Sequence, residues 1–369
     1  MNIINVELGE RSYPIMIGDA MLGQFPDALQ NIAACNNCIV VADQTVAEFH
    51  IEPLVAILKS SGVQAHLITF PAGEQSKAMH TFETVISEIV KNGGGRDWPL
   101  LAFGGGVVGD LAGFVAASYM RGLPFIQMPT TLLAQVDSSV GGKVGINHPF
   151  AKNLIGAFYQ PRLVWIDTDY LKTLPQREII CGFAEIAKYG MISDPQFFEF
   201  CEGNLHKILH LDRAAISIAI ARSCEIKAKI VAQDEQDWGL REILNFGHTV
   251  GHALEACLDY SHINHGEAVF WGMFIEGMIA QEMGIFSKAD FSRFRRFLAQ
   301  IPLKASIEGI KPEKIINNMQ LDKKARKGKL RFVLPVSIGR TMVIDDVDQE
   351  LISHSLRYAQ RHEWTALQS

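Results

Sequence analysis

Four of the twelve histidines of this chain, His248, His252, His262 and His265, fall within one short stretch. His248 and His252 are four residues apart in a segment predicted to be helical through Glu255, so their imidazole rings would extend from one face of the helix, one turn apart. Neutral imidazole is a common ligand of Zn²⁺, and a catalytic zinc typically has three protein ligands and one open position. The spacing therefore predicts a metal or catalytic site, to which His265 could return across a short loop.

A packing role is the alternative for this histidine pair. Gly247 and Gly251 lie beside it and would allow a close contact between helices. An i, i+4 pair alone does not separate the two interpretations. His262 has no partner at helical spacing, and we interpret it as a loop residue.

A glycine-rich turn forms a second candidate site. The run Gly104-Gly-Gly-Val-Val-Gly-Asp110 joins a buried strand ending at Phe103 to an apolar helix running toward Ser118. Glycine allows the backbone to approach a pyrophosphate, and a helix N-terminus adds free N–H groups and the positive end of its dipole. The turn predicts a dinucleotide ligand. The spacing differs from G-x-G-x-x-G and no acidic residue follows at the ribose position, so an ordinary glycine turn stays the alternative.

Two further sets of charged residues lie between and beyond these motifs. Residues 121–169 are rich in Thr, Ser, Gly and Lys, which is typical of a binding loop, although Lys143 and Lys152 by themselves would be solvated surface lysines. Glu185 and Lys188 are three residues apart on one helical face. They form either an intrahelical ion pair or a ligand beside a cation that binds substrate.

The surrounding segments set the fold that must position these residues. Up to residue 175 the chain alternates between strands and helices, which predicts a parallel sheet with ligands at the carboxyl ends of its strands. Beyond it the pattern is mainly helical. We therefore predict an N-terminal α/β, Rossmann-like parallel-sheet domain over residues 1–175 and a mainly α-helical C-terminal domain over residues 176–369. The expected strands are 38–42, 66–70, 99–103 and 163–167, and the expected helices are 46–60, 77–91, 214–231 and 291–298.

Composition limits the class of protein. A chain of 369 residues, of which 48% are hydrophobic and 20% charged, fits a two-domain globular protein. The formal net charge of −6 argues against nucleic acid as the main partner. We see no apolar run of membrane-spanning length and no signal peptide, so we expect a cytoplasmic protein. The six scattered cysteines are expected to be reduced thiols.

Taken in order along the chain, the motifs resemble those of the 3-dehydroquinate synthase family. They cover almost the full length, and their number and order make the resemblance specific. The motifs are Gly73-Glu-Gln-Ser-Lys77, Gly104-Gly-Gly-Val-Val-Gly-Asp110, Pro129-Thr-Thr-Leu-Leu-Ala-Gln-Val-Asp-Ser-Ser-Val-Gly-Gly-Lys143, Lys152-Asn153, Leu171-Lys-Thr-Leu-Pro175, Ala184-Glu-Ile-Ala-Lys-Tyr-Gly190, Leu244-Asn-Phe-Gly-His-Thr-Val-Gly-His252, His265-Gly-Glu267 and Asp322-Lys-Lys324.

The resemblance implies an activity and two cofactors. The family converts 3-deoxy-D-arabino-heptulosonate 7-phosphate to 3-dehydroquinate and phosphate, a step of the shikimate pathway toward aromatic amino acids. It uses NAD and a divalent metal, usually zinc, with cobalt as the alternative. Transient oxidation, phosphate elimination, re-reduction and aldol cyclisation leave no net redox change. A homodimer is implied by the resemblance alone.

The resemblance also implies roles for individual residues. Glu185, His248 and His265 would be the metal ligands, and His252 would bind the substrate phosphate. The residues expected to take part in catalysis are Asp137, Lys143, Lys188, Lys227, Arg241, Asn245 and His252. Those expected to bind substrate are Arg121 reaching in from a partner subunit, Lys152, Asn153, and one of Lys323 and Lys324. Those expected to bind NAD are Asp43, Glu74, Lys77, Gly105, Gly106, Val107, Asp110, Thr130, Thr131, Lys143, Lys152, Thr173 and Leu174.

Other functions must be weighed beside this one. Related sugar phosphate cyclases, which make valiolone- or inosose-type rings, would share the NAD site and the metal ligands. A glycerol-type NAD-dependent metal dehydrogenase would share the two-domain plan but release NADH stoichiometrically, and a regulatory protein would bind the same ligands without turnover. Lys227, Arg241, Asn245 and His252 together suit a substrate with a carboxylate and a phosphate, which favours 3-dehydroquinate synthase.

Overall fold

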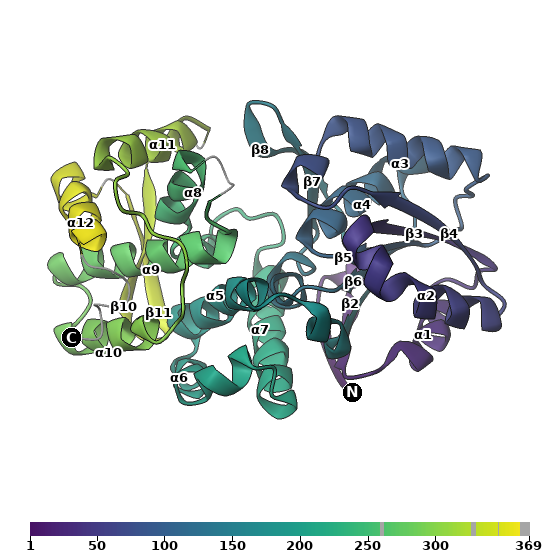
Figure 1. Cartoon of the computed structure of the whole chain (residues 1–369), viewed down its shortest axis with the longest axis horizontal. Helices are drawn as coiled ribbons and strands as arrows, with labels where there is room; N and C mark the ends of the chain where they lie inside the picture. The colour runs from purple at the N-terminus through teal and green to yellow at the C-terminus, as the bar shows by residue number, and fades with distance from the viewer. Residues whose placement is uncertain (259–261, 326–329, 346, 362–369) are drawn as a thin grey trace. The chain divides into compact units, whose positions relative to one another are not determined.

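The computed structural model describes residues 1–258, 262–325, 330–345 and 347–361, without the side chains of residues 321–325. Its contacts divide the chain into two compact units. The first unit comprises Met1–Ile179 and Arg213–Gln236, and the second comprises Ile180–Asp212 and Asp237–Ser369. Figure 1 labels most of the helices and strands of both units.

The first unit contains a seven-stranded sheet with the order β1-β2-β9-β6-β5-β3-β4. All neighbours pair in parallel except β1 and β2, which form an antiparallel hairpin. This sheet confirms the Rossmann-like prediction. The strands are β1 Asn2–Val6, β2 Tyr13–Gly18, β3 Asn37–Asp43, β4 Gln64–Phe70, β5 Leu100–Gly104, β6 Phe125–Pro129 and β9 Leu163–Asp167.

Two hydrophobic cores cover the two faces of this sheet. In β3, Ile39 and Val41 belong to one core, while Val40 and Ala42 belong to the other, as the two-residue period of a strand requires. The first core includes α3 and α4, and the second includes α1 and α2. These helices are α1 Phe25–Ile32, α2 Gln44–Ser60, α3 Met79–Lys91 and α4 Gly106–Ser118, joined by the short helices η1 Gly9–Arg11, η2 Leu22–Gln24, η3 Glu74–Ser76, η4 Tyr119–Arg121 and η6 Thr168–Thr173.

The expected binding loop at residues 121–169 is more ordered than the sequence indicated. It contains a π-helix, η5 Ala134–Ser138, and an antiparallel hairpin of β7 Lys143–His148 and β8 Ala151–Phe158, besides β6 and β9. Gly145 and Gly156 face each other in the hairpin, and a Cβ on either would come within 2.5 Å of the opposite backbone. The glycines that made this segment look like a loop are therefore required by the close strand pairing.

The second unit is mainly helical. Its central helix is α9 His265–Glu282, which is buried on all sides from Gly266 to Ala280 and begins with a capping box between Asn264 and Glu267. The remaining elements are α5 Gln176–Ser193, whose first residues belong to the first unit, α6 Pro195–Leu209, η7 Leu240–Asn245, α8 His248–Cys257, α10 Lys288–Ala299, α11 Pro312–Ala325, α12 Gln349–Arg361, and the hairpin of β10 Arg331–Ser337 and β11 Arg340–Asp345.

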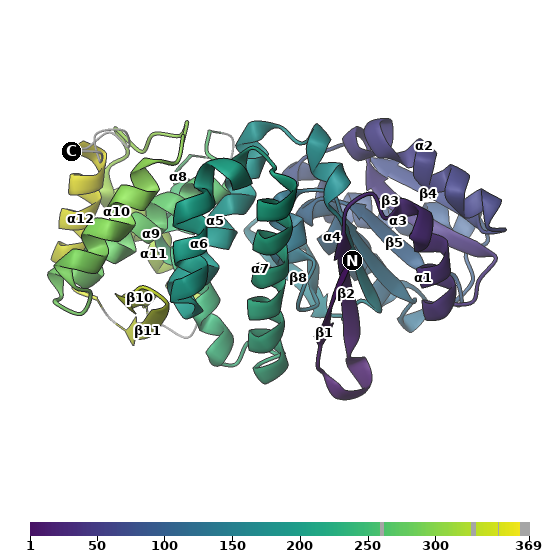
Figure 2. The ribbon, with the colours of Figure 1, turned by 90° about the horizontal axis from the view of Figure 1, so that it is seen from below.

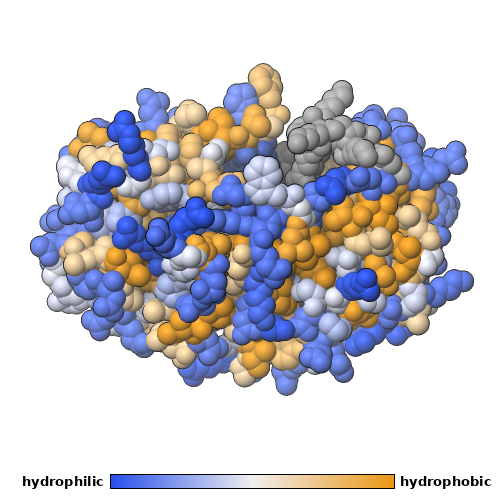
Figure 3. Space-filling model, turned by 180° about the vertical axis from the view of Figure 1, so that it is seen from behind, coloured by the Kyte–Doolittle hydropathy of each residue, from blue (hydrophilic) through white to orange (hydrophobic). Residues whose placement is uncertain are grey.

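The compact units differ from the expected domains at α7 Arg213–Gln233. This helix follows residue 176, but it packs against β1 and β2 and belongs to the first unit (Figure 2). The chain also passes from the first unit to the second within α5, at Ile179, rather than at residue 175. Among the described residues no helix is long and apolar enough to span a membrane, and hydrophilic side chains are spread over the face drawn in Figure 3.

Candidate metal centre and nucleotide site

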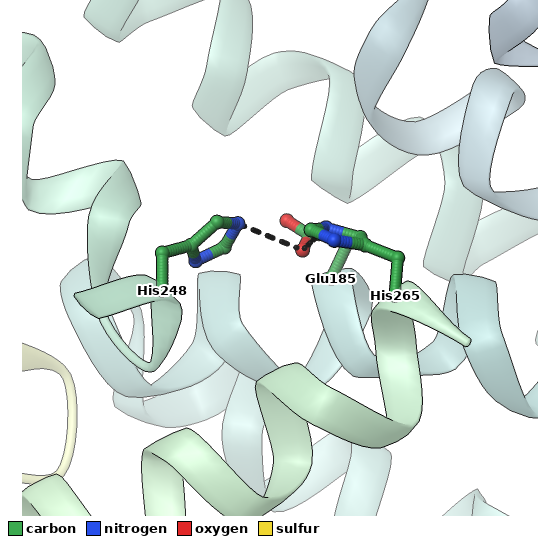
Figure 4. A group of neighbouring side chains, drawn as sticks. All are labelled: Glu185, His248 and His265. Atoms are coloured by element: carbon green, nitrogen blue, oxygen red, sulfur yellow. Dashed lines mark ion pairs between the residues drawn. The ribbon is translucent and has the colours of Figure 1, made fainter. Parts of the chain in front are cut away.

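Three helices of the second unit bring a carboxylate and two imidazoles together. Glu185 lies in α5, His248 is the first residue of α8, and His265 is the first residue of α9. One ligand atom of each residue lies within 4.8 Å of the others. Figure 4 shows both imidazole rings directed at the Glu185 carboxylate. The structure therefore brings together the three residues expected to bind metal.

Neighbouring groups fix the orientation of both imidazoles. The Nδ1 atom of His248 lies 3.1 Å from the Phe246 carbonyl oxygen, which leaves Nε2 facing Glu185 Oε1 at 3.5 Å. The Nδ1 atom of His265 lies 3.7 Å from Glu255 Oε2, while its Nε2 lies 3.6 Å from Glu185 Oε1. In metal sites, an acceptor at the outer nitrogen sets the tautomer and aims the inner nitrogen at the ion. Both histidines have this arrangement.

The electrostatics of the cluster differ between its two histidines. Burial lowers the pKa of His265, but Glu185 and Glu255 outweigh burial and raise that pKa to about 10. Burial, with the charge of Lys188, lowers the pKa of His248 well below its usual value. The Glu185 carboxylate itself is completely buried and forms an ion pair with Lys188. Glu185 and Glu255 therefore favour a positive charge at His265, whereas burial and Lys188 oppose one at His248.

This donor set fits a divalent transition metal. Imidazole nitrogen and carboxylate oxygen suit Zn²⁺ and its first-row neighbours, and three protein ligands leave a position for water or substrate, as in catalytic zinc sites. The residues that would hold the ion are Glu185, His248 and His265.

His252 and Glu255 complete the surroundings of the cluster. The His252 ring centroid lies 5.3 Å from that of His248 and 6.1 Å from that of His265, and His252 is exposed. His252, Glu255 and His265 also form a second group with metal-ligand spacing. The sequence analysis missed Glu255. Residues 248, 252 and 255 fall on one helical face, and this spacing could have identified Glu255 as a neighbour of the two histidines.

The candidate nucleotide site lies in the first unit, at the carboxyl ends of its parallel strands. β3 is flanked by β4 on one side and β5 on the other, and the chain passes from β3 to β4 and then returns to β5. A change of direction of this kind is where parallel α/β sheets bind ligands. Asp43 ends β3, and the glycine turn follows β5, so both border the switch point.

The glycine turn packs against neighbouring loops that would leave little room for larger side chains. Gly105 is the N-cap of α4, and a Cβ there would lie 3.0 Å from Thr131 Cγ2. A Cβ on Gly106 would lie 3.1 Å from Ser138 Oγ. The turn thus presents backbone N–H groups at a helix N-terminus, as a pyrophosphate requires. Val107 follows in the first turn of α4, and Thr130 precedes Thr131 after β6.

Lys77 connects two of the expected ligand-binding segments. Its buried ammonium donates to Asp110 Oδ2 at 2.5 Å and also to the side-chain oxygen of Asn153. Asn153 lies in β8 and has a positive φ. Burial raises the pKa of Asp110, against the opposing charge of Lys77. Glu74 accepts from the Asn147 side chain at 2.7 Å, and Asn147 in turn accepts from the Asn153 N–H. The network ties the β4–α3 loop to α4 and to the hairpin.

The other expected nucleotide residues lie at the same edge of the sheet or just beyond it. Asp43 Oδ1 accepts from Val46 N and so caps α2. Thr173 contacts His50 Nε2 at 2.8 Å through its hydroxyl, and Leu174 follows at the end of η6.

The expected substrate residues of the first unit fall into two groups. Lys227 in α7 is buried and donates to Asp137 Oδ1 at 2.7 Å, on the π-helix. Lys143 and Lys152 lie on the β7–β8 hairpin, with Lys143 exposed and Lys152 half-buried, and Arg121 is exposed in η4.

In the second unit, Lys188 and Arg241 are buried cations, and Asn245 ends η7 three residues before His248. Burying an arginine or a lysine is costly unless an anion pairs with it. Lys323 and Lys324 lie in α11, but their side chains are outside the described part of the chain.

The two candidate sites fit an enzyme that uses a dinucleotide and a metal ion, and comparison with known proteins supports this class. Sequence models of the 3-dehydroquinate synthase N-terminal and C-terminal domains match residues 67–181 and 182–325. The chain is also 46% identical over 360 residues to a 3-dehydroquinate synthase of Vibrio atlanticus, covering 97% of this chain and 99% of that protein. The chain belongs to the 3-dehydroquinate synthase family.

Solved structures support the same class. A 2-epi-5-epi-valiolone synthase from Streptomyces hygroscopicus with bound NAD⁺ and Zn²⁺ has a TM-score of 0.89 at 28% identity, covering 96% of this chain and 98% of that one. A 2-deoxy-scyllo-inosose synthase complexed with carbaglucose-6-phosphate, NAD⁺ and Co²⁺ has a TM-score of 0.87 at 25% identity, covering 97% and 99%. These relatives confirm the predicted fold.

Proposed function

We propose that this chain is a 3-dehydroquinate synthase, a phosphorus–oxygen lyase that converts 3-deoxy-D-arabino-heptulosonate 7-phosphate to 3-dehydroquinate and phosphate. The observation that carries the proposal is the convergence of Glu185, His248 and His265 from three helices, in a chain 46% identical to a 3-dehydroquinate synthase over nearly its whole length. The product is an intermediate of aromatic amino acid synthesis through the shikimate pathway.

The proposed cofactors are NAD and a divalent metal, zinc or cobalt. The related synthase structures with NAD⁺ and either Zn²⁺ or Co²⁺ support this choice, as do the donor set of the metal cluster and the glycine turn at the switch point. When bound, the metal supplies Lewis acidity at a substrate hydroxyl and the nicotinamide supplies a hydride acceptor.

The chain's own residues would bind and orient the substrate. Buried Lys227 of the first unit and buried Arg241 of the second unit are proposed to bind its carboxylate, because a charge-assisted hydrogen bond from a cation to a carboxylate is strong and directional. Such fixed contacts also hold the reacting carbon atoms in one orientation. In the first unit, we propose that Asp137 binds a ring hydroxyl, while Lys143, Lys152 and Asn153 bind the phosphate. In the second unit, the proposed roles are ring hydroxyls for Lys188 and Asn245, and phosphate for His252 and one of Lys323 and Lys324.

We also propose that the protein acts as a homodimer in the cytoplasm, with Arg121 reaching into the partner's site. Phe150 and Leu154 of the hairpin are exposed, and Tyr159 at its end donates to the Leu123 carbonyl, which places the hairpin beside the Arg121 turn. Exposed apolar side chains of this kind are typical of an interaction surface. All six cysteines are free thiols, as expected in a reducing compartment.

A turnover experiment tests the proposed function. The metal-loaded protein is incubated with the heptulosonate phosphate and a trace of NAD⁺, while phosphate release and NADH absorbance are followed. We expect many phosphates per NAD⁺ and no lasting NADH, because the hydride returns to the substrate. Glucose 6-phosphate, which has no carboxylate, serves as the control substrate and should release none. Stoichiometric NADH would indicate a dehydrogenase, and release from the control alone would indicate a different cyclase.

Gly105→Ala is expected to weaken NAD⁺ binding roughly tenfold, the effect of about 1.4 kcal/mol of crowding. Gly105 has φ −76°, so alanine is not strained there, but its Cβ would meet Thr131 at 3.0 Å where the dinucleotide must approach. Calorimetric titration with NAD⁺ measures the effect. Gly203→Ala is the matched control, because a Cβ there meets nothing within 4 Å. Equal NAD⁺ affinity in the two variants would place the nucleotide elsewhere.

A further inference from the structure

A fully buried carboxylate lies between α8 and α9, the two helices that carry His248 and His265. Glu276 of α9 is 0% exposed. Its Oε2 accepts from the N–H of Gly247 at 2.6 Å, and its Oε1 accepts from the N–H of Val250 at 3.3 Å. Both donors belong to the first turn of α8. Burial raises the pKa of Glu276 to about 8, against the opposing effect of these N–H groups.

The start of α8 lacks a cap of its own. Its N-cap is Gly247, which has φ +80° and no side chain. The first N–H groups of a helix need an acceptor, and an Asp, Asn, Ser or Thr at the N-cap is the usual source. Here Glu276 provides the acceptors from a neighbouring helix, 29 residues further along the chain.

Glycines allow the same turn of α8 to pack closely against α9. A Cβ on Gly272 would come within 1.9 Å of the Gly247 carbonyl oxygen, and a Cβ on Gly247 within 2.8 Å of the Val269 carbonyl oxygen. Gly272 is one turn before Glu276, on the same side of α9. The hydrogen bonds and the close backbone contact therefore fix the position of the first turn of α8 along the axis of α9.

We propose that Glu276 is a positioning residue for the metal centre, holding the first turn of α8 so that His248 directs Nε2 at Glu185. His248 directly follows Gly247, so any shift of that turn moves its imidazole. His265 begins the helix that carries Glu276, so the same contact sets the spacing of the two histidines. Glu276 contacts neither histidine among its hydrogen bonds, and it acts through the backbone. The inference rests on the metal site of the proposed function.

Zinc affinity in two variants tests this role. Wild-type protein, Glu276→Ala and Glu276→Gln are titrated with Zn²⁺ against a chromophoric chelator, and the visible absorption spectrum of each Co²⁺-loaded protein is recorded. We expect Glu276→Ala to bind Zn²⁺ roughly 10–100-fold more weakly, the usual effect of losing a supporting contact at a metal site. Glu276→Gln keeps the volume and one acceptor oxygen, so a smaller loss and a shifted Co²⁺ spectrum are expected. If the alanine variant does not fold, the glutamine variant decides.

Two controls separate positioning from general stability. Glu282→Ala removes a glutamate at the other end of α9, paired with His354 at 3.2 Å, and should leave both readouts unchanged. Leu356→Ala removes a fully buried side chain of α12 and should lower the melting temperature without changing the Zn²⁺ affinity or the Co²⁺ spectrum. Wild-type Zn²⁺ affinity and Co²⁺ spectra in both Glu276 variants would overturn the role of Glu276 alone. Failure of the wild-type protein to bind Zn²⁺ would overturn the metal centre of the proposed function and this inference with it.

Discussion

His265→Ala is expected to lose its metal and to turn over substrate roughly 10³–10⁴-fold more slowly than the wild-type protein. Lewis-acid stabilisation by a bound metal contributes several kcal/mol to a transition state, and about 1.4 kcal/mol is a factor of ten in rate. With only Glu185 and His248 left, the site falls below the three ligands of a catalytic zinc. Metal content after dialysis and the initial rate of phosphate release are the two measurements.

The fold is expected to survive this substitution. His265 is the first residue of α9, and the capping box between Asn264 and Glu267 holds the start of that helix without it. His262→Ala is the matched control from the same stretch, because His262 is an exposed residue and not one of the proposed ligands. It should retain both metal and turnover. A His265→Ala protein with wild-type metal content would contradict the ligand assignment.

Much of the fold could be predicted because its strands are buried on both faces. A parallel strand covered by helices on each side appears in the sequence as a short unbroken apolar run. The expected strand at residues 163–167 is found as β9 Leu163–Asp167, buried throughout. The β7–β8 hairpin could not be predicted in this way. Gly145 and Gly156 allow its strands to pair closely, but glycines in a sequence indicate a loop.

The metal cluster was only partly predictable from spacing. The histidine pair at i, i+4 pointed to His248, but it ranked His252 as an equal candidate because both lie on one helical face. Which of the two histidines faces Glu185 depends on where α5 packs. The helical periodicity of residues 248–255 does not predict the position of α5. For Glu185, the spacing left an ion pair and a ligand as alternatives, and the resemblance to the family selected the ligand. Glu276 could not be found from either source, because its role arises from the packing of α8 on α9.

Lys188→Met is expected to separate metal binding from turnover. Lys188 and Glu185 form a buried ion pair, with side chains 2% and 0% exposed. Because the ammonium competes with a metal ion for the same carboxylate, its removal should leave Zn²⁺ affinity equal to or higher than that of the wild-type protein. Turnover should fall roughly 10²–10³-fold, the usual effect of removing one oriented group that stabilises charge. Competition with a chelator and phosphate release measure the two quantities.

The same variant should make folding depend on the metal. Without zinc, Glu185 would lose its buried partner Lys188, and breaking a buried ion pair typically costs about 3–5 kcal/mol. Zinc restores a positive partner, so the difference in melting temperature between loaded and chelated protein should be larger in Lys188→Met than in the wild-type protein. Lys91→Met is the matched control, because Lys91 pairs with Glu88 at the same i, i+3 spacing but on the surface. An exposed pair contributes about 0.2–1 kcal/mol. A weaker Zn²⁺ affinity in Lys188→Met would show that the ammonium supports the ion rather than competing with it.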